Sequence, residues 1–185
     1  MTSLLTSMGL GIGAGVNAYA TLLVFGVLAR LRPGMFDGEM AQFFSSTPVL
    51  IGLGVLYTAE FLADKIPAID HVWDVIHTFI RPVAGALVGW AAAEPSMPKG
   101  WVMVAAAIAG GAALTSHAAK SSLRVASTTT TAGAANPVIS LLEDGFAIVN
   151  AVVAIFLPVL VGVVVVLLAI FFLVLARRYR KRESF

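Results

Sequence analysis

The chain has 185 residues, of which 59% are hydrophobic and only 12% are charged, and its mean hydropathy is +0.94. This balance lies far from that of a soluble domain and predicts an integral membrane protein whose surroundings are the lipid bilayer. The chain contains no cysteine, which excludes disulfides, thioether-linked haem and thiolate metal sites.

The sequence pI of about 9.2 arises largely at the C-terminal end. Residues 177–185 hold five of the twelve lysines and arginines. Basic segments beside an apolar span mark the cytoplasmic side of a membrane. We therefore predict an inner (plasma) membrane protein with a basic cytoplasmic tail at 177–185 and no nucleic-acid partner. Binding of this tail to anionic lipid is an alternative to a purely topological role.

Two long stretches of the chain carry no charge. Residues 4–29 are long enough, at about 1.5 Å per residue, to cross a hydrocarbon core of roughly 30 Å, which predicts one continuous span. The segment before it has no basic flank, so we expect the span to be retained rather than cleaved. The second uncharged stretch covers residues 145–176. The whole segment 138–176, which includes Glu143 and Asp144, is too long for one span, and Pro158 divides it. The proline predicts either a tight hairpin or a sharply broken helix.

The segments after the first span are less regular. A second span is predicted to begin at Val49, directly after Pro48. Residues 67–82 place apolar side chains on one side and ionisable ones on the other, which predicts a two-faced helix. Residues 83–93 are uncharged but short for a span, so they form either a continuation of that helix or a half-length element.

The next predicted span starts at Trp101 and is rich in alanine and glycine. Its helical period continues into a basic stripe formed by His117, Lys120 and Arg124. The threonine-rich residues 127–135 are predicted to form a loop. Asn136 is expected to cap the following helix, with Pro137 in the first turn.

These segments predict an all-α polytopic membrane protein with about five or six hydrophobic elements in a single domain over residues 1–176. The halves 1–95 and 96–176 resemble each other weakly. Each has a small-residue helix with a polar residue, then a proline, then acidic residues. This order is compatible with an inverted repeat whose discontinuous helices meet near the midplane, although the spacing from proline to carboxylate differs between the halves.

The most informative feature is a set of ionisable residues within otherwise apolar sequence. They are Glu60, Asp64, Lys65, Asp70, Asp74, His77, Arg81, His117, Lys120, Arg124, Glu143 and Asp144. Each Asp, Arg or Lys that faces lipid at a helix centre costs roughly 2.5–3.5 kcal/mol. About six at that depth would exceed the typical net stability of roughly 5–15 kcal/mol. These residues must therefore lie at an interface, line a wet cavity or pair with one another.

Two interpretations of this set remain open. In the first, the charges form a structural ion-pair network, and the polar face of residues 67–82 meets water. In the second, they form a polar pathway or binding site, in which the two histidines respond to pH. Glu143 and Asp144 are adjacent and diverge by about 100° on a helix. We expect Glu143 to point inward and Asp144 to pair with Lys120 or Arg124.

Part of the sequence resembles a known family. The motif is Glu60-x-x-x-Asp64-Lys65-x-Pro67-x-x-Asp70-x-x-Trp73-Asp74-x-x-His77-x-x-x-Arg81-Pro82-x-x-Gly85-Ala86, followed by His117-x-x-Lys120-x-x-x-Arg124 and Ser140-x-x-Glu143-Asp144. It resembles the bacterial and plant membrane family known as domain of unknown function 4126, over roughly residues 9 to 165. The resemblance implies a small polytopic membrane protein whose polar residues act as one unit, and it implies no settled activity.

The leading functional hypothesis is a transporter or channel for a small ion or polar solute, with or without proton coupling. No nucleophile arrangement, cofactor motif or metal-ligand spacing is present in the sequence, so we expect neither an enzyme, a cofactor nor a metal site. The alternatives are a non-transporting scaffold or assembly factor and a protein that binds lipid headgroups. Few spans enclose a pathway alone, so a homodimer is one expected arrangement.

Overall fold

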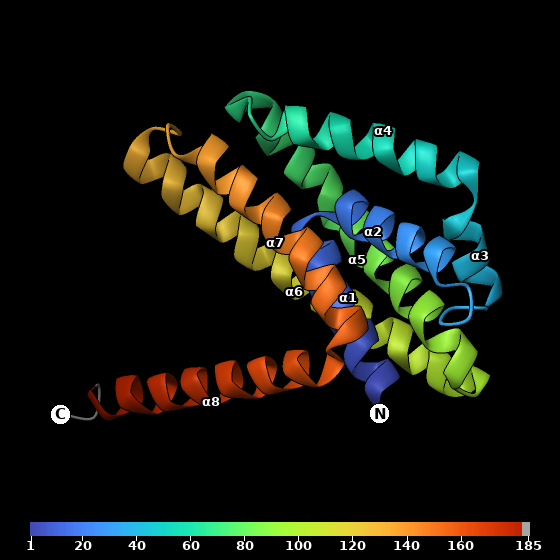
Figure 1. Ribbon diagram of the computed structural model, residues 1–185. Coiled ribbons are helices and arrows are strands. Elements are labelled where there is room, and N and C mark those ends of the chain that lie inside the picture. The colour runs from blue at the N-terminus through green and yellow to red at the C-terminus, as the bar shows by residue number, and fades with distance from the viewer. Residues whose placement is uncertain (183–185) are drawn as a thin grey trace.

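The chain folds entirely into helices over the residues that the computed structural model describes (Figure 1), which confirms the predicted all-α class. These are residues 1–182 for the backbone, and 1–66 and 72–177 for the side chains. The helices are α1 (Thr2–Val16), α2 (Ala18–Leu31), α3 (Glu39–Ser45), α4 (Thr47–Ala63), α5 (Pro67–Ala93), the short 3₁₀ helix η1 (Glu94–Ser96), α6 (Lys99–Thr131), α7 (Asn136–Phe156) and α8 (Pro158–Arg182).

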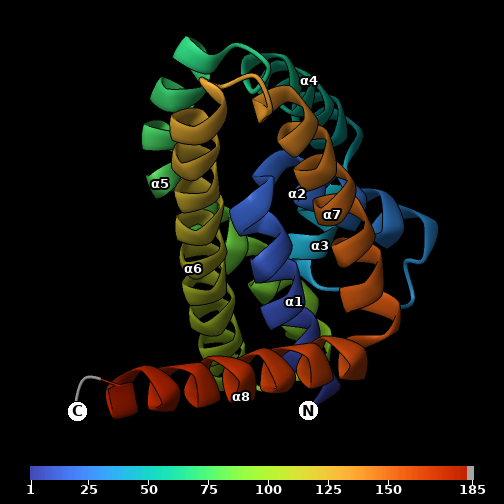
Figure 2. The ribbon, with the colours of Figure 1, turned by 90° about the vertical axis from the view of Figure 1, so that its left-hand side faces the viewer.

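Helix α1 lies in the middle of the molecule and packs against α5, α6 and α7 (Figure 2). Small residues allow α1 to lie this close to its neighbouring helices, as expected for close helix packing. A Cβ added at Gly11 or Gly15 would collide with the backbone of α6 at Ala109 or Ala113. On α5, Gly85 and Gly89 face the same two alanines. Helices α1, α5 and α6 therefore approach one another at nearly backbone distance.

The predicted continuous span over residues 4–29 is wrong. The helix breaks at Asn17, whose backbone is extended (φ −144°, ψ 107°), and α1 and α2 run in different directions (Figure 1). The Asn17 side chain accepts a hydrogen bond from the Ala20 N–H and so caps α2. No proline marks this break, which depends on an asparagine in an otherwise apolar segment.

Helices α3 and α4 are bent by 63° relative to each other. A tight turn then leads from the end of α4 into α5, which runs unbroken through Pro82, so residues 83–93 continue the two-faced helix. This helix turns its polar face into the protein and its apolar face outward, which is the opposite of the orientation in which the polar face would meet water. Its apolar Val72 and Phe79 are 63% and 76% exposed, whereas His77 and Arg81 are 0% exposed. The interpretation in which this polar face meets water is therefore wrong for His77 and Arg81.

The α6–α7 connection is shorter than predicted, because the expected loop over residues 127–135 is helical as far as Thr131. The hydroxyls of Thr130 and Thr131 donate to backbone carbonyls one turn earlier, which lets them remain inside the helix. The chain turns at Ala132 and Gly133, which have φ values of 52° and 84°. Asn136 is not the helix cap; its side chain accepts a hydrogen bond from Ser127 at 2.8 Å.

A break at Leu157 separates α7 from α8, which confirms the division predicted at Pro158. Helix α8 extends away from the other helices along the bottom of Figure 1. Its apolar segment has a mean hydropathy of 3.4, and only 6% of that segment is buried. The surface of α8 is thus suited to lipid along most of its length.

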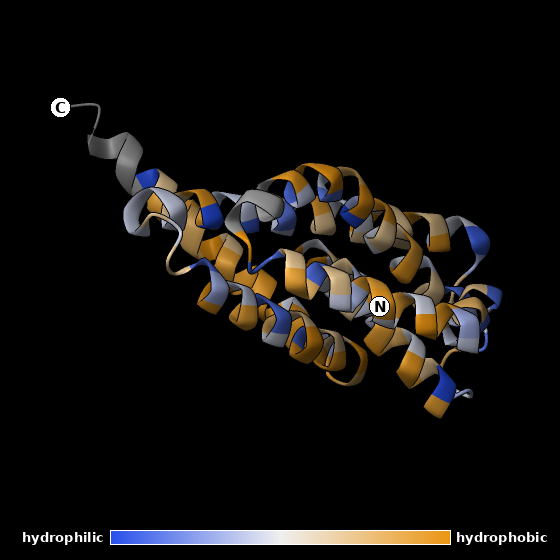
Figure 3. Ribbon diagram, turned by 90° about the horizontal axis from the view of Figure 1, so that it is seen from above, coloured by the Kyte–Doolittle hydropathy of each residue, from blue (hydrophilic) through white to orange (hydrophobic). Residues whose placement is uncertain are grey.

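Within the described residues, four helices are long and apolar enough to cross a membrane, or five if the bent pair α3–α4 counts as one span. Apolar residues occur along all the helices and outnumber the scattered hydrophilic ones (Figure 3). This arrangement is compatible with a multi-pass membrane protein that contacts the bilayer over most of its surface.

Candidate functional site

The predicted ionisable residues gather at the end of the bundle where the α4–α5 and α6–α7 turns lie, opposite α8 (Figure 1). Those that are at most 8% exposed are Glu60, Asp64, His77, Arg81, His117, Lys120, Arg124, Glu143 and Asp144. We call these residues, together with Asp74, the charged network. It is built from α4, α5, α6 and α7, and it reaches the break between α1 and α2.

Arg81 organises one part of the charged network. Its guanidinium lies 2.8 Å from Glu60 Oε1 and 3.4 Å from Asp74 Oδ1. It also contacts His117 Nδ1 on α6. A planar guanidinium can contact several partners at fixed angles, which a lysine cannot. Arg81 therefore ties α4, α5 and α6 together.

The hydrogen bonds of His117 define its protonation. Nδ1 faces the Arg81 guanidinium, which can only donate, so Nδ1 is the acceptor. Nε2 lies 3.1 Å from Thr78 Oγ1, and that hydroxyl gives its own proton to the Asp74 carbonyl. The His117 Nε2–H is therefore the donor to Thr78. Both ring nitrogens are occupied in the neutral form.

A second part of the charged network contains Asp64, Lys120, Arg124 and Glu143. Arg124 lies 2.7 Å from Asp64 and 2.6 Å from Glu143, and Lys120 lies 3.4 Å and 3.3 Å from the same carboxylates. Burial alone would raise the pKa of Asp64, which follows the last residue of α4, but the Lys120 ammonium and the Arg124 guanidinium hold it below its usual range. Lys120 also donates to the Val16 carbonyl at 2.9 Å, at the end of α1.

The predicted pairing of Asp144 is wrong. Asp144 does not pair with Lys120 or Arg124; it accepts a hydrogen bond from the Asn17 amide at 2.8 Å. Glu143 takes both cations instead. The two adjacent carboxylates point in different directions, as expected. Glu143 points toward the cations of α6, and Asp144 points toward the break at Asn17.

Charge does not balance within the charged network. It contains five carboxylates and three fixed cations, so with every carboxylate ionised and both histidines neutral it would carry an excess of two negative charges. Among the described residues, one buried oxygen on each of four carboxylates also finds no hydrogen-bond partner: Glu60 Oε2, Asp64 Oδ1, Glu143 Oε1 and Asp144 Oδ2. Unpaired buried carboxylate oxygens are costly, so the network favours protons, water or cations as further partners.

Two grooves reach the charged network from different faces of α6. One, of about 390 Å³, lies between α1, α6 and α7; it is mostly apolar and ends at Lys120 and Glu143. The other, of about 380 Å³, lies between α5 and α6 and includes Asp74 and Arg124. The 2.6 Å ion pair between Arg124 and Glu143 connects a residue of one groove to a residue of the other.

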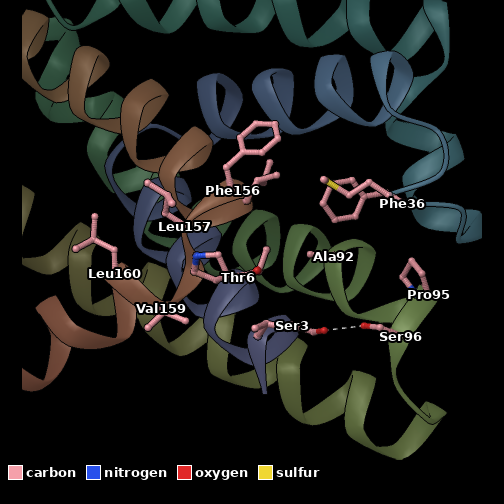
Figure 4. Close-up of a pocket in the computed structure, with 14 residues that line it drawn as sticks. Ser3, Thr6, Phe36, Ala92, Pro95, Ser96, Phe156, Leu157, Val159 and Leu160 are labelled. Carbon is pink, nitrogen blue, oxygen red and sulfur yellow. Dashed lines mark hydrogen bonds between the residues drawn. The ribbon is translucent and has the colours of Figure 1, made fainter.

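A larger cavity of about 590 Å³ lies at the opposite end of the bundle, near the N-terminus (Figure 4). Ser3, Phe36, Ser96 and Leu160 are among the residues that line it, and Ser3 and Ser96 are joined by a hydrogen bond of 2.7 Å. Its lining contains no charged side chain. This cavity has none of the chemistry of the charged network.

Two predicted residues are not assigned to the charged network. The side chain of Asp70 lies outside the described residues. The Lys65 ammonium bonds to the Phe61 carbonyl at 2.9 Å and lies 3.2 Å from the centre of the Phe61 ring, so Lys65 stays with its own helix end. Within the described part of the chain, no group of three or more His, Asp or Glu side chains is arranged to hold a metal ion.

The list of candidates from the sequence omitted the neutral members of the site. Asn17, Thr78 and the Val16 carbonyl each contact a member of the charged network. Asn17 stood out in the sequence only as the polar residue of the first apolar helix. A buried asparagine in such a helix needs a partner, and that requirement is the signal by which it could have been found.

The comparisons with known proteins agree with the sequence motif. No curated protein and no solved structure matches the chain at a significant level. The family described as Domain of unknown function (DUF4126) matches residues 4–178, which is nearly the whole chain and includes every member of the charged network. The chain belongs to the DUF4126 family.

Proposed function

We propose that this protein is a non-enzymatic transporter or channel for a small ion or polar solute, located in the inner membrane with its C-terminus in the cytoplasm. The observation that carries the proposal is the unbalanced charge of the charged network, with one unpartnered buried oxygen on each of four carboxylates. A purely structural ion-pair network gains nothing from such an excess. A site that binds and releases a cation or a proton requires one.

The two grooves support the same proposal. Each reaches the charged network from a different side of α6, and the Arg124–Glu143 ion pair lies between them. If this ion pair broke, Glu143 would become accessible to the solute, and Arg124 would remain paired with Asp64. The breaks at Asn17 and Leu157 resemble the discontinuous helices of transporters, and the inverted relation of the two halves stays a prediction.

The test is flux through the purified protein in liposomes, for a panel of small cations, anions and protons. Glu143→Gln keeps the shape of the side chain and removes the charge that binds both cations. We expect it to fold and to lose flux. The matched control is Glu39→Gln, the same change on an exposed carboxylate outside the network, which should transport like the wild type.

Two results would contradict the proposal. In one, the wild type dissipates none of the gradients in the panel. In the other, Glu143→Gln carries the same flux as the wild type. Thermal unfolding against the same panel gives a separate measure of binding, because a ligand that binds only the native state raises the unfolding midpoint.

A second candidate is binding of a lipid headgroup, which the groove between α1, α6 and α7 favours. Its apolar wall and its end at the Lys120 ammonium match an anionic amphiphile. This function predicts stabilisation by one anionic lipid that is lost in Lys120→Met. Stabilisation by inorganic ions alone would argue against it.

A further inference from the structure

One ring nitrogen of His77 has no hydrogen-bond partner among the described residues. Its Nδ1 lies 2.8 Å from the Trp73 carbonyl oxygen. A carbonyl can only accept, so Nδ1 carries the hydrogen. In the neutral ring, Nε2 is then a bare acceptor, and it is buried without a hydrogen-bond partner. Glu60 Oε1 lies 3.8 Å from this nitrogen.

Two acceptors therefore face each other in a fully buried place, since His77 and Glu60 are both 0% exposed. A bare imidazole nitrogen and a carboxylate oxygen repel each other unless a hydrogen lies between them. We propose that His77 Nε2 and Glu60 Oε1 form a binding site for one proton. The proton adds to either acceptor, and the two atoms, 3.8 Å apart without it, then approach to hydrogen-bond distance; no other bond is made or broken.

A proton fits this site better than a metal ion. The Arg81 guanidinium already lies 2.8 Å from the same Glu60 oxygen and would repel a second cation. Moreover, the described residues supply no third ligand. The Tyr19 ring of α2 packs against His77 in a T-shaped arrangement, with 5.5 Å between the ring centres. Since His77 and Glu60 are both 0% exposed, a bound proton is shielded from bulk solvent.

Titratable groups face the proposed proton site from each neighbouring helix. They are Tyr19 on α2, Asp64 at the end of α4, Asp74 and Arg81 on α5, and His117 and Lys120 on α6. Helix α1 contributes no ionisable side chain. Fixed cations oppose the added proton, and the two-charge excess of carboxylates in the charged network favours it.

His117 is an internal control. It is also buried and also contacts Arg81, but both of its ring nitrogens have partners in the neutral form. A proton added to His117 would have to displace Arg81 from Nδ1. The two histidines thus differ in one respect that matters here, which is a bare nitrogen facing a carboxylate.

This inference deepens the proposed function, because it names the proton as an ion that binds to the charged network. It rests on the proposed function only for the release of that proton on the other side of the membrane. The test is nitrogen NMR of histidine-labelled full-length protein in lipid nanodiscs, titrated from about pH 3 to 8, a range that extends to low pH because the site is buried and lies beside Arg81. We expect the His77 Nδ1–H signal at every pH and a change from bare to protonated at Nε2, while His117 keeps its Nε2–H form throughout.

The deciding variant is Glu60→Gln. Its amide oxygen can still accept from Arg81 but cannot take up a proton, and the carboxylate charge that favours protonation of His77 is gone, so the Nε2 titration should shift to lower pH or disappear. Asp74→Asn is the matched control, because it alters another partner of Arg81 and leaves the His77–Glu60 contact intact. His77 should still titrate in this variant.

The proposal is overturned if His77 Nε2 stays bare across the range, or if it titrates unchanged in Glu60→Gln. If Glu60→Gln does not fold, infrared spectroscopy of glutamate-labelled wild type decides: a change in the carboxylate or carboxyl bands at the midpoint of the His77 titration supports a shared proton, and the absence of any such change overturns it. Titration without any flux would overturn the transport proposal alone, and flux of another ion without titration would overturn the proton site alone.

Discussion

Helix α6 buries one continuous stripe of side chains, but the two halves of that stripe differ in chemistry. The first half consists of Val102, Ala105, Ala106, Ala109 and Ala113. The second half consists of His117, Lys120, Arg124 and Ser127, at the same spacing of three or four residues. The first half packs by shape against α1 and α5 and leaves no room for an added methyl group. The second half forms ion pairs, so the loss of one of its charges should destabilise the fold.

The largest expected effect is on the charged half. Arg124→Met removes the guanidinium that lies within 2.7 Å of both Asp64 and Glu143 and leaves them without their main partner. Loss of one member of a buried ion pair typically costs about 3–5 kcal/mol. We expect a loss of that size in the free energy of unfolding, measured by denaturant titration in mixed micelles.

Arg124→Lys keeps the charge and loses the planar fork, so it should fall between the wild type and Arg124→Met. If Arg124→Met were as stable as the wild type, the second half of the stripe would not depend on charge.

The shape-packed half is tested by Gly11→Ala. The new methyl group would meet the Ala109 backbone of α6, which cannot move without shifting the helix. Overpacking of this kind typically costs about 1–3 kcal/mol. The control is Gly111→Ala, on α6 itself, where nothing lies within 4 Å of the added Cβ. We expect the control to be neutral or slightly stabilising, and equal losses in both variants would contradict the close approach of α1 and α6.

Asn17 joins the two regions, because it ends the small-residue helix α1 and donates to Asp144 of the charged network. Asn17→Ala removes this bond and the cap of α2, and loss of a cap typically costs about 0.5–2 kcal/mol. Asn17→Asp keeps an acceptor for the cap but places a second carboxylate against Asp144. Its stability should therefore improve as the pH is lowered, whereas that of Asn17→Ala should not show this gain.

The smallest effect is expected at the end of the stripe. Ser127→Ala removes the hydrogen bond to Asn136 that closes the α6–α7 turn, a loss of about 0.5–1.5 kcal/mol. Ser122→Ala is the control on the exposed side of the same helix, where the hydroxyl donates to the Ala118 carbonyl one turn earlier in α6. A larger loss at Ser122 than at Ser127 would show that the turn does not depend on this contact.

The same comparison explains which features could be predicted. The stripe of His117, Lys120 and Arg124 follows from spacing along one helix, and so does the two-faced pattern of residues 67–82. Their carboxylate partners come from α4 and α7, which lie up to 60 residues away in the chain. Spacing alone carries no information about such contacts. It identified the residues of the charged network and not its pairings.

Two other differences have local causes. The break at Asn17 was missed because apolar composition and length indicate a span and reveal nothing of a single extended residue. The threonines of residues 128–131 suggested a loop because β-branched residues are poor helix formers. Their hydroxyls bond to carbonyls of the preceding turn, and this bonding keeps the segment in α6.

The hydrogen bond from Lys120 to the Val16 carbonyl has a consequence for ion exchange. At the end of α1, Lys120 is a cation tethered among the oxygens of Asp64, Glu143 and the peptide backbone. Any free cation that reaches these oxygens competes with an ammonium that cannot diffuse away and is therefore present at high effective concentration. The affinity measured for such a cation is the difference between its own binding and the displacement of this built-in competitor.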